Sequence, residues 1–250
     1  MKITFIGTGS GKASLNRFHS SLLISAGGYN LLVDAGDSIS RALLSRDLSC
    51  NSINGILISH LHPDHSGGFA ALIVQMKMNN RKEPLEIFVH HTLIGTLKNF
   101  LSFSYIFAER IGFPIHFAGF NFDDGIQISG ELYFIAKKNS HLEEYEVYDP
   151  SLSYASASFL FKSGDNIVCY SGDLGSPDDL YLFKDYKADI FITEAAHVSY
   201  ENILEMTIKL KPGKVILTHL AEDGIPGINP ESIINDSMII ARDGLIVSVE

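Results

Sequence analysis

The sequence is poor in several features that would assign it to particular protein classes. It has two cysteines, Cys50 and Cys169, and no tryptophan among its 250 residues. Two cysteines are too few for a disulfide framework, so we expect both to be reduced thiols in a cytoplasmic protein. No apolar run approaches the ~18 residues that a membrane-spanning helix needs, and the opening residues are typical of a strand and a turn rather than of a signal peptide.

Positive charge is also scarce. The chain has 19 Lys and Arg against 29 Asp and Glu, which gives a formal net charge of −10. Because phosphate contacts supply most of the affinity for extended nucleic acids, this balance disfavours a large non-specific nucleic-acid surface. Hydrophobic residues make up 46% of the chain, enough for a substantial core. With no low-complexity segment or obvious linker, we expect a single domain over residues 1–250.

The most informative segment is Ser59–Gly68, with the sequence SHLHPDHSGG. An apolar run, Ile56–Ile58, precedes it, and the helix-like stretch Phe69–Met78 follows it. A junction between a strand and a helix can aim several side chains at one point, because the end of a strand is rigid. Solvated loop histidines are the alternative interpretation, and the ligand types, their spacing and the glycine pair all disfavour it.

Three imidazoles and a carboxylate lie within six residues of this segment. His60 and His62 can reach one metal ion, while Asp64 and His65 turn toward a second one a few ångströms away. Nitrogen and oxygen ligands of this kind suit zinc, manganese or iron.

The chain also contains a weak internal duplication. Residues 20–37 and 156–173 both have the pattern of a hairpin that ends in an aspartate, and later in each half an apolar strand ends in a histidine, at His60 and at His219. Two similar halves in which strands alternate with helices predict two sheets packed face to face with helices outside, chance similarity of hydrophobic hairpins being the alternative. The expected strands cover residues 2–7, 20–25, 29–34, 54–59, 85–90, 115–119, 131–137, 156–162, 166–171, 188–193, 213–218 and 245–249, and the expected helices cover residues 38–47, 67–79, 92–109, 199–210 and 230–236.

The segment from His60 to His65 resembles the His-x-His-x-Asp-His signature of the metallo-β-lactamase superfamily. The resemblance implies that superfamily's α/β fold, a four-layer αββα sandwich of two mixed sheets with outer helices. Three later residues follow expected strands and match later motifs of the superfamily: His141, Asp173 and His219. The resemblance implies two divalent metal ions, zinc or else manganese or iron, with His60, His62 and His141 on one, Asp64, His65 and His219 on the other, and Asp173 bridging them.

Asp34 ends an apolar strand, where a buried carboxylate needs partners. Orienting a ligand imidazole would satisfy it, and capping a turn is the competing interpretation.

The opening of the chain narrows the resemblance. Phe5–Ser10, Arg17, Ser20–Ile24 and Leu32–Gly36 are similar to ribonuclease Z and its relatives, which cleave phosphodiesters, including the 3′ trailer of precursor transfer RNA.

A second cue is the sequence Glu194-Ala195-Ala196-His197, in which His197 precedes His219 by 22 positions. The resemblance implies that His197 protonates the leaving oxygen, that Glu194 orients His197, and that Asp64 helps to orient or deprotonate the attacking water. The alternative is that His197 caps a helix that begins near Ser199.

Two departures argue against transfer RNA as the substrate. Only 31 residues separate His141 from Asp173, and we expect a hairpin to fill them, which leaves no room for the long transfer-RNA-gripping arm of ribonuclease Z. The aromatic and arginine residues that follow the last ligand in that family are also missing after His219. We therefore predict a metal-dependent phosphodiesterase acting on a cyclic or short nucleotide. A carboxylic-ester, lactone or thioester hydrolase and a transfer RNA 3′ processing endonuclease remain as alternatives.

The run from His91 to Phe122 is unusually aromatic. We expect most of its rings to belong to the core, the alternative being an apolar flap over the active site or a dimer surface. This stretch, together with the dimers common in the resembled branch, predicts a homodimer. The expected partners are thus a second copy and a small-molecule or short-nucleotide substrate, with no membrane contact.

Overall fold

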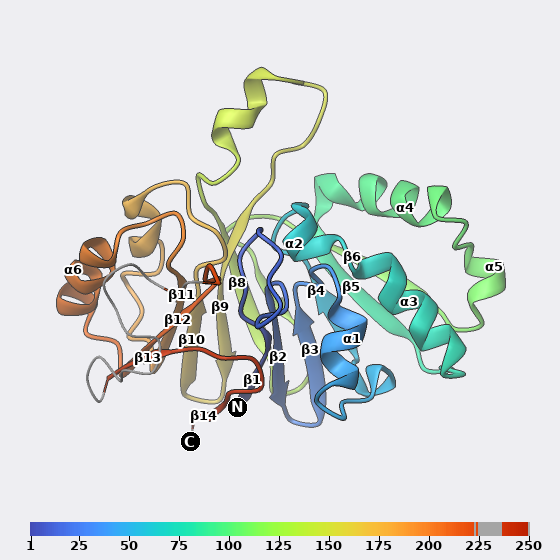
Figure 1. Cartoon of the computed structure of the whole chain (residues 1–250), viewed down its shortest axis with the longest axis horizontal. Coiled ribbons are helices and arrows are strands. Elements are labelled where there is room, and N and C mark those ends of the chain that lie inside the picture. Colours follow the sequence, from blue (N-terminus) through green and yellow to red (C-terminus); the bar gives the residue numbers. More distant parts are fainter. Residues whose placement is uncertain (223, 225–236, 250) are drawn as a thin grey trace.

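The computed structural model describes residues 1–222, 224 and 237–249, which form two seven-stranded mixed sheets packed face to face with helices outside (Figure 1). The first sheet has the order β14-β1-β2-β3-β4-β5-β6, and the second has the order β13-β12-β11-β10-β9-β8-β7. The predicted four-layer fold is therefore confirmed. Across the described part of the chain, no helix has both the length and the apolar character that crossing a lipid bilayer requires.

The strands are short, as the alternating apolar patterns predict. They are β1 (Lys2–Gly7), β2 (Ser21–Ala26), β3 (Tyr29–Val33), β4 (Gly55–Leu57), β5 (Leu85–His90), β6 (Ile115–Phe120), β7 (Gly125–Gln127), β8 (Tyr133–Lys138), β9 (Ala157–Ser163), β10 (Asn166–Tyr170), β11 (Ile190–Glu194), β12 (Lys214–Thr218), β13 (Met238–Ile240) and β14 (Ile246–Ser248). The helices are α1 (Ile39–Leu44), α2 (Pro63–Ser66), α3 (Phe69–Met78), α4 (Ile94–Phe103), α5 (Ala108–Ile111) and α6 (Tyr200–Leu210), with the 3₁₀ turns η1 (Cys50–Ser52), η2 (His91–Leu93), η3 (Glu143–Val147) and η4 (Pro177–Tyr181).

The two sheets repeat one topology. In the first sheet, β2 and β3 form an antiparallel hairpin, and β4 and β5 follow it in parallel. In the second sheet, β9 and β10 form the hairpin, and β11 and β12 follow it in parallel. The internal duplication seen in the sequence is therefore present in the fold, and it places the carboxyl ends of corresponding strands at one edge of the sandwich.

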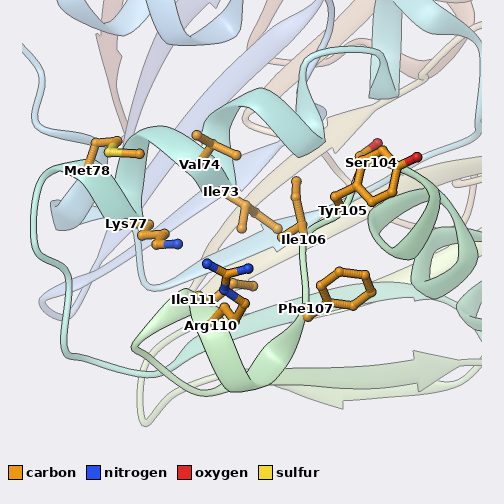
Figure 2. A pocket seen from close by; sticks show the side chains of 10 residues that line it. All are labelled: Ile73, Val74, Lys77, Met78, Ser104, Tyr105, Ile106, Phe107, Arg110 and Ile111. Atoms are coloured by element: carbon orange, nitrogen blue, oxygen red, sulfur yellow. The ribbon is translucent and has the colours of Figure 1, made fainter.

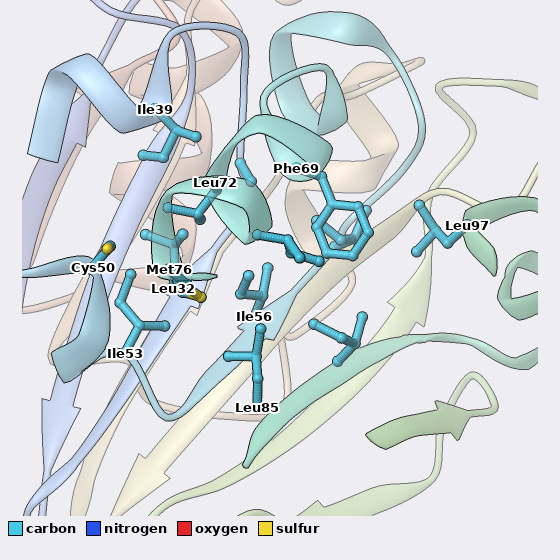
Figure 3. Close-up of a cluster of buried hydrophobic side chains, with 14 of the residues drawn as sticks. Leu32, Ile39, Cys50, Ile53, Ile56, Phe69, Leu72, Met76, Leu85 and Leu97 are labelled. Carbon is cyan, nitrogen blue, oxygen red and sulfur yellow. The ribbon is translucent and has the colours of Figure 1, made fainter. Parts of the chain in front are cut away.

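Both faces of each sheet are covered, which explains why the central strands are apolar on both sides. Leu31 and Val33 of β3 pack between the two sheets, whereas Leu32 points outward to the helices, because successive side chains of a strand alternate between faces. Figure 3 shows this outer layer, where Phe69, Leu72 and Met76 of α3 pack over the first sheet. A corresponding cluster lies between the second sheet and α6.

The end of the chain completes the first sheet. Strand β14 pairs with β1, and the amino group of Met1 donates a 3.1 Å hydrogen bond to the carbonyl of Val249. Nearby, the Asp243 carboxylate accepts hydrogen bonds from the backbone of Thr8 and Phe18 and from the Thr8 hydroxyl. Residues close to both ends of the described chain thus hold one another in place.

Several boundaries differ from the sequence prediction. The helix expected over residues 92–109 is divided into η2, α4 and α5, and Tyr105, with φ +58°, lies in the break between the last two. The helix expected over 67–79 is preceded by the separate turn α2. Strands β7 and β13, of three residues each, were not predicted. The helix expected over 230–236 lies outside the described residues.

A protruding segment between β8 and β9 also corrects the sequence analysis, which expected only a hairpin between His141 and Asp173. The β9–β10 hairpin is present, but residues 142–155 and their turn η3 rise away from the sheets, at the top of Figure 1. We call residues 142–155 the arm. Its side chains Val147 and Tyr148 are each 80% exposed.

The aromatic stretch from His91 to Phe122 is less buried than predicted. Phe113 and Phe120 belong to the core, as expected, but Phe103 and Tyr105 are 83% and 84% exposed. Phe100 and Phe107 are also exposed. The expectation that most of these rings are core is therefore wrong for the α4–α5 region, where the chain turns away from the sheet.

Candidate metal centre

The structure brings all seven predicted ligand side chains together at the carboxyl ends of the strands. The first half supplies His60 and His62 from the loop after β4, and Asp64 and His65 from α2. The second half supplies one residue after each of three strands: His141 after β8, Asp173 after β10 and His219 after β12.

These side chains form two groups that share one carboxylate. In each group the ligand atoms lie within 4.8 Å of one another: His60, His62, His141 and Asp173 in one, and Asp64, His65, His219 and Asp173 in the other.

Asp173 lies between the two groups. Its Oδ1 is 3.1 Å from Nε2 of His65, and its Oδ2 is 3.3 Å from Nε2 of His219 and 3.7 Å from Nε2 of His141. One carboxylate oxygen therefore faces histidines of both groups, which is the geometry that a bridging ligand needs.

Three of the candidate ligand imidazoles have a hydrogen-bonding partner at Nδ1, on the side away from the other candidate ligands. His65 Nδ1 lies 2.8 Å from Oδ2 of Asp34, and His219 Nδ1 lies 2.7 Å from the hydroxyl of Ser20. His60 Nδ1 lies 3.1 Å from the hydroxyl of Ser59. These contacts fix the rings so that Nε2 points inward, as the outer partners of metal-binding histidines do.

Asp34 is fully buried and is itself well satisfied. Besides His65, it accepts hydrogen bonds from the backbone and the hydroxyl of Ser59, at 2.8 and 2.9 Å. Asp34 therefore supports the imidazole of His65, a candidate ligand, as the sequence analysis expected. Its φ of +63° is unusual for a residue other than glycine, and aspartate tolerates this region better than most residues do.

Gly36 allows α2 to lie close to the end of β3. A Cβ atom on Gly36 would lie 2.2 Å from the carbonyl oxygen of Asp64. Only glycine permits this approach, which seats α2 directly against the end of β3. Packing against α2 therefore explains the glycine at the end of the Leu32–Gly36 motif, and the same motif places Asp34.

Burial and charge act in opposite directions on these groups. Burial, helped by neighbouring imidazoles such as His65, lowers the pKa of His60 well below its usual value, and burial lowers the pKa of His141 to about 4. Burial also acts to lower the pKa of His65, but the carboxylates of Asp173 and Asp34 outweigh it and raise that pKa well above the usual value. Burial acts to raise the pKa of Asp173, and His65 and His219 reverse this and lower it strongly.

The site contains buried polar atoms that no described residue satisfies by hydrogen bonding. They are Nε2 of His60, together with Nε2 of His65 and Oδ1 of Asp173, which lie 3.1 Å apart without the geometry of a hydrogen bond. Buried groups of this kind are costly without a partner. Imidazole nitrogens and an ionised carboxylate that converge in this way form a donor set that fits divalent cations.

His197 lies beside the two groups without belonging to either. Its ring centroid is 4.9 Å from that of His141 and 5.7 Å from that of His219, and its side chain is 40% exposed. The helix-cap alternative is wrong, because the hydroxyl of Ser199 caps α6 by accepting from the backbone N–H of Asn202.

Glu194 holds His197 in this position. Its Oε2 accepts hydrogen bonds from the backbone N–H groups of Ala196 and His197, and its Oε1 lies 3.3 Å from Nδ1 of His197. The hydrogen bond to Glu194 and the charge of that carboxylate raise the pKa of His197, although burial partly opposes them. A histidine with a raised pKa retains its proton at higher pH and can donate it.

A cavity of about 470 Å³ opens next to His62, His141 and His197. Its other wall is the base of the arm, including Glu143, Glu144 and Tyr145. The ring of Tyr145 packs edge-on against His62, with 5.8 Å between centroids. Tyr145 was not among the predicted site residues, although an aromatic ring four residues after the candidate ligand His141 was a signal.

The sequence matches a family described as the anti-Pycsar protein Apyc1, over residues 1–232. A protein named anti-Pycsar protein Apyc1, from Bacillus phage BSP38, is 26% identical over 239 residues, which cover 89% of this chain and 90% of the phage protein. A ribonuclease Z from Methanococcus aeolicus is 39% identical over 105 residues, or 42% of this chain and 33% of that protein. The matched residues thus cover about a third of the length of that archaeal relative.

Solved structures share the fold at low sequence identity. The short form of human tRNase Z superposes with a TM-score of 0.75 at 19% identity, covering all of both chains. The metallo-β-lactamase fold protein YhfI from Bacillus subtilis gives 0.74 at 20% identity, covering 98% of each chain. The fold is therefore that of the metallo-β-lactamase superfamily, as the sequence motif implied.

Proposed function

Because the chain belongs to the family of anti-Pycsar Apyc1 proteins, we propose that it is a metal-dependent hydrolase that cleaves a phosphodiester, with a cyclic or short nucleotide as the substrate. The observation that carries the proposal is the position of His197 beside two converging donor groups. Hydrolysis of a phosphodiester with an alkoxide leaving group needs both charge neutralisation and an acid. The two donor groups can hold cations that neutralise the charge, and His197 can supply the acid.

We propose that His60, His62 and His141 hold one divalent cation, that Asp64, His65 and His219 hold the other, and that Asp173 bridges them. The orphaned buried atoms of His60, His65 and Asp173 support this assignment. Zinc is the ion that a site rich in imidazole and carboxylate favours, and manganese and iron accept the same donors. When bound, such a pair supplies positive charge to the phosphate and lowers the pKa of a water molecule.

The remaining chemistry belongs to side chains of this chain. His197, kept protonated by Glu194, donates its proton to the departing alkoxide from the open side of the site. Asp64, whose Oδ2 lies 3.5 Å from Nε2 of His65, is placed to orient the attacking water. An acyl hydrolase acting on an ester, lactone or thioester has no comparable need for an acid at His197.

The shape and charge around the centre support a small substrate. The cavity beside His197 has a volume of about 470 Å³, and its arm wall carries the carboxylates of Glu143 and Glu144. With a net charge of −10 for the chain, this wall is a poor surface for the backbone of transfer RNA, whose many phosphates would be repelled. The names ribonuclease Z and anti-Pycsar protein, carried by the relatives, are compatible with phosphodiester substrates of different sizes.

We also propose a cytoplasmic homodimer. Both cysteines are buried and reduced, and the aromatic side chains exposed around α4 and α5 provide a surface that a second copy can cover.

The test combines metal analysis with a substrate panel. Protein purified without chelator should contain close to two equivalents of metal per chain. The loaded protein should hydrolyse bis-p-nitrophenyl phosphate and cyclic nucleotides faster than lactones or thioesters. A metal content near zero in protein purified from metal-supplemented medium would remove the metal centre, and faster acyl hydrolysis would favour the acyl-hydrolase alternative.

A further inference from the structure

One carboxylate oxygen in the second half of the chain accepts four hydrogen bonds from three residues. It is Oδ2 of Asp179, in the turn η4. The backbone N–H and the hydroxyl of Ser140 donate to it, at 3.1 and 2.7 Å. The backbone N–H groups of Gly175 and Ser176 also donate to it, at 3.0 and 3.2 Å. The proposed phosphodiesterase reaction gives Asp179 no role.

These contacts join two loops that carry candidate metal ligands. Ser140 immediately precedes His141 in the loop after β8, whereas Gly175 follows Asp173 in the loop after β10. The loops also touch directly, since a Cβ atom on Gly175 would lie 2.3 Å from the carbonyl carbon of Ser140. We call the contact between Ser140, Gly175 and Asp179 the seam. It sets how His141 stands relative to Asp173, whose Oδ2 lies 3.7 Å from Nε2 of His141.

Capping of η4 is the competing explanation for Asp179. Ser176 precedes the turn, and Asp179 accepts from its backbone N–H as the acidic member of a capping box does. This local role accounts for one of the four hydrogen bonds. The other three come from Ser140 and Gly175, outside the capping box. Because hydrogen bonds to an ionised carboxylate are roughly twice as strong as neutral ones, the larger part of this contact joins the two loops.

His141 depends on its loop more than the other candidate ligand imidazoles do. Three of those have a hydrogen-bonding partner at Nδ1. Among residues 1–222, 224 and 237–249, nothing forms a hydrogen bond with Nδ1 of His141, and its Nε2 lies 3.1 Å from Nδ1 of His62, itself a candidate ligand. The backbone N–H of His141 donates to the side chain of Asn139 at 3.3 Å. The ring is therefore placed by the backbone of residues 139–141, which the seam holds.

We propose that Asp179 is a positioning residue of the metal centre. It holds the loop of His141 against the loop of Asp173, and it thereby sets the affinity for the ion of the donor group that contains His141. The other donor group takes no residue from the loop after β8. Loss of the seam should therefore weaken the binding of one ion far more than that of the other. The inference rests on the proposed function, because it requires that the site holds metal.

Zinc affinity tests the proposal independently of turnover. Asp179→Ala removes the shared acceptor and leaves every candidate ligand in place. In competition with a chromophoric chelator, one of the two zinc equivalents should bind about 10- to 100-fold more weakly than in the wild type, the range typical of groups that support metal ligands. The other equivalent should change much less. Asp179→Asn keeps an acceptor oxygen but loses the charge, so it should recover part of the affinity.

Two controls separate the seam from other effects of substitution. Asp178→Ala removes the exposed aspartate next to Asp179 in the same turn, with the same change in charge. Lys77→Ala changes the groove between α3 and the α4–α5 turn, which Figure 2 shows and which lies on the helices over the first sheet. Both controls should leave the two zinc affinities unchanged.

Equal weakening of both equivalents in Asp179→Ala would indicate general destabilisation and would overturn the proposal, as would unchanged affinities or an equal loss in Asp178→Ala. If circular dichroism shows that Asp179→Ala does not fold, Gly175→Ala decides. Its methyl group forces the two loops apart from the other side and should also weaken one equivalent, so two unchanged affinities would overturn the proposal. A wild type that binds no zinc would remove the proposed metal centre itself, and this inference with it.

Discussion

The two halves of the molecule share a strand order but supply the metal centre in different ways. The first half delivers four donor side chains within six residues, between β4 and α3, whereas the second half delivers one donor at the end of each of three strands. A compact motif can be recognised without knowledge of the fold. The three donors of the second half are far apart in the sequence and meet only when the sheet brings the ends of their strands together. Their recognition therefore depends on the tertiary structure.

The halves also differ in what they expose. The donors of the first half are braced by Asp34 and Ser59, and His60 and His65 are completely buried. The second half carries His197, which is 40% exposed and faces the open cavity. The first half thus holds three of its candidate donors, His60, Asp64 and His65, buried, whereas the second half places an exposed histidine beside the open cavity. Four substitutions test this difference between the two halves.

Asp173→Ala should cause the largest loss, because it removes the one carboxylate that belongs to both donor groups. We expect activity on bis-p-nitrophenyl phosphate to fall by more than about 10⁴-fold, beyond the usual contribution of a general acid. Metal analysis should show the loss of at least one equivalent. Asp185→Ala, which changes an exposed aspartate of the same half, is the control. If Asp173→Ala keeps both metals and most of its activity, the bridging role is wrong.

His197→Ala should keep both metals and lose turnover by about 10²- to 10⁴-fold on a phosphodiester with an alkoxide leaving group. The loss should shrink for p-nitrophenyl esters, because their leaving group needs little protonation. Steady-state kinetics on the two substrate types, with exposed His116→Ala as the control, measures the difference. Equal losses on both types would contradict a role as the acid, and loss of metal or of the fold would make His197 a structural residue.

Asp34→Ala should lower activity by about 10- to 100-fold, the range typical of groups that support a metal ligand. It removes the partner of His65 but no donor. Because alanine is strained at the φ of +63° found here, Asp34→Asn provides a second variant that tolerates this backbone. If Asp34→Ala loses as much activity as Asp173→Ala, then Asp34 does more than support His65, and the proposed difference between the two residues is wrong.

Glu194→Gln should have the smallest effect, a shift of the pH profile. The hydrogen bond to Glu194 and its charge raise the pKa of His197. A general acid acts below its pKa, so activity is lost as the pH rises through it. Removing the charge lowers that pKa, and the alkaline limb of the kcat/KM profile should therefore move to lower pH. Glu205→Gln on α6 should leave the limb in place, and a shift to higher pH in Glu194→Gln would contradict the role of the carboxylate.

The fold was largely predictable, because its signals are local and periodic. Apolar alternation located the central strands, and the repeated hairpin predicted the two-sheet arrangement that β2–β3 and β9–β10 confirm. Strand β7, of three residues, was missed, whereas the equally short β4 and β14 lie within the longer runs expected over 54–59 and 245–249. Asp34 was also predictable, since a buried carboxylate at the end of a strand requires a partner and His65 supplies it.

The periphery was predicted less well, and for a physical reason. Aromatic content does not distinguish a buried ring from an exposed one, so Phe103 and Tyr105 were wrongly expected in the core. The arm was missed because polar residues around Glu143–Val147 have no periodicity that separates a protruding turn from an ordinary loop. How the arm borders the cavity depends on packing between segments that are distant in the sequence.

The closing of the first sheet by β14 has a consequence for how the protein is made. The hydrogen bond between Met1 and Val249 joins residues 248 positions apart, so strand β1 emerges from the ribosome long before its outer neighbour exists. Until β14 arrives, β1 is an open edge that can pair with another nascent chain. Contacts of such long sequence separation also form slowly. Aggregation during synthesis should therefore depend on the last strand, although that strand contributes no donor to the metal centre.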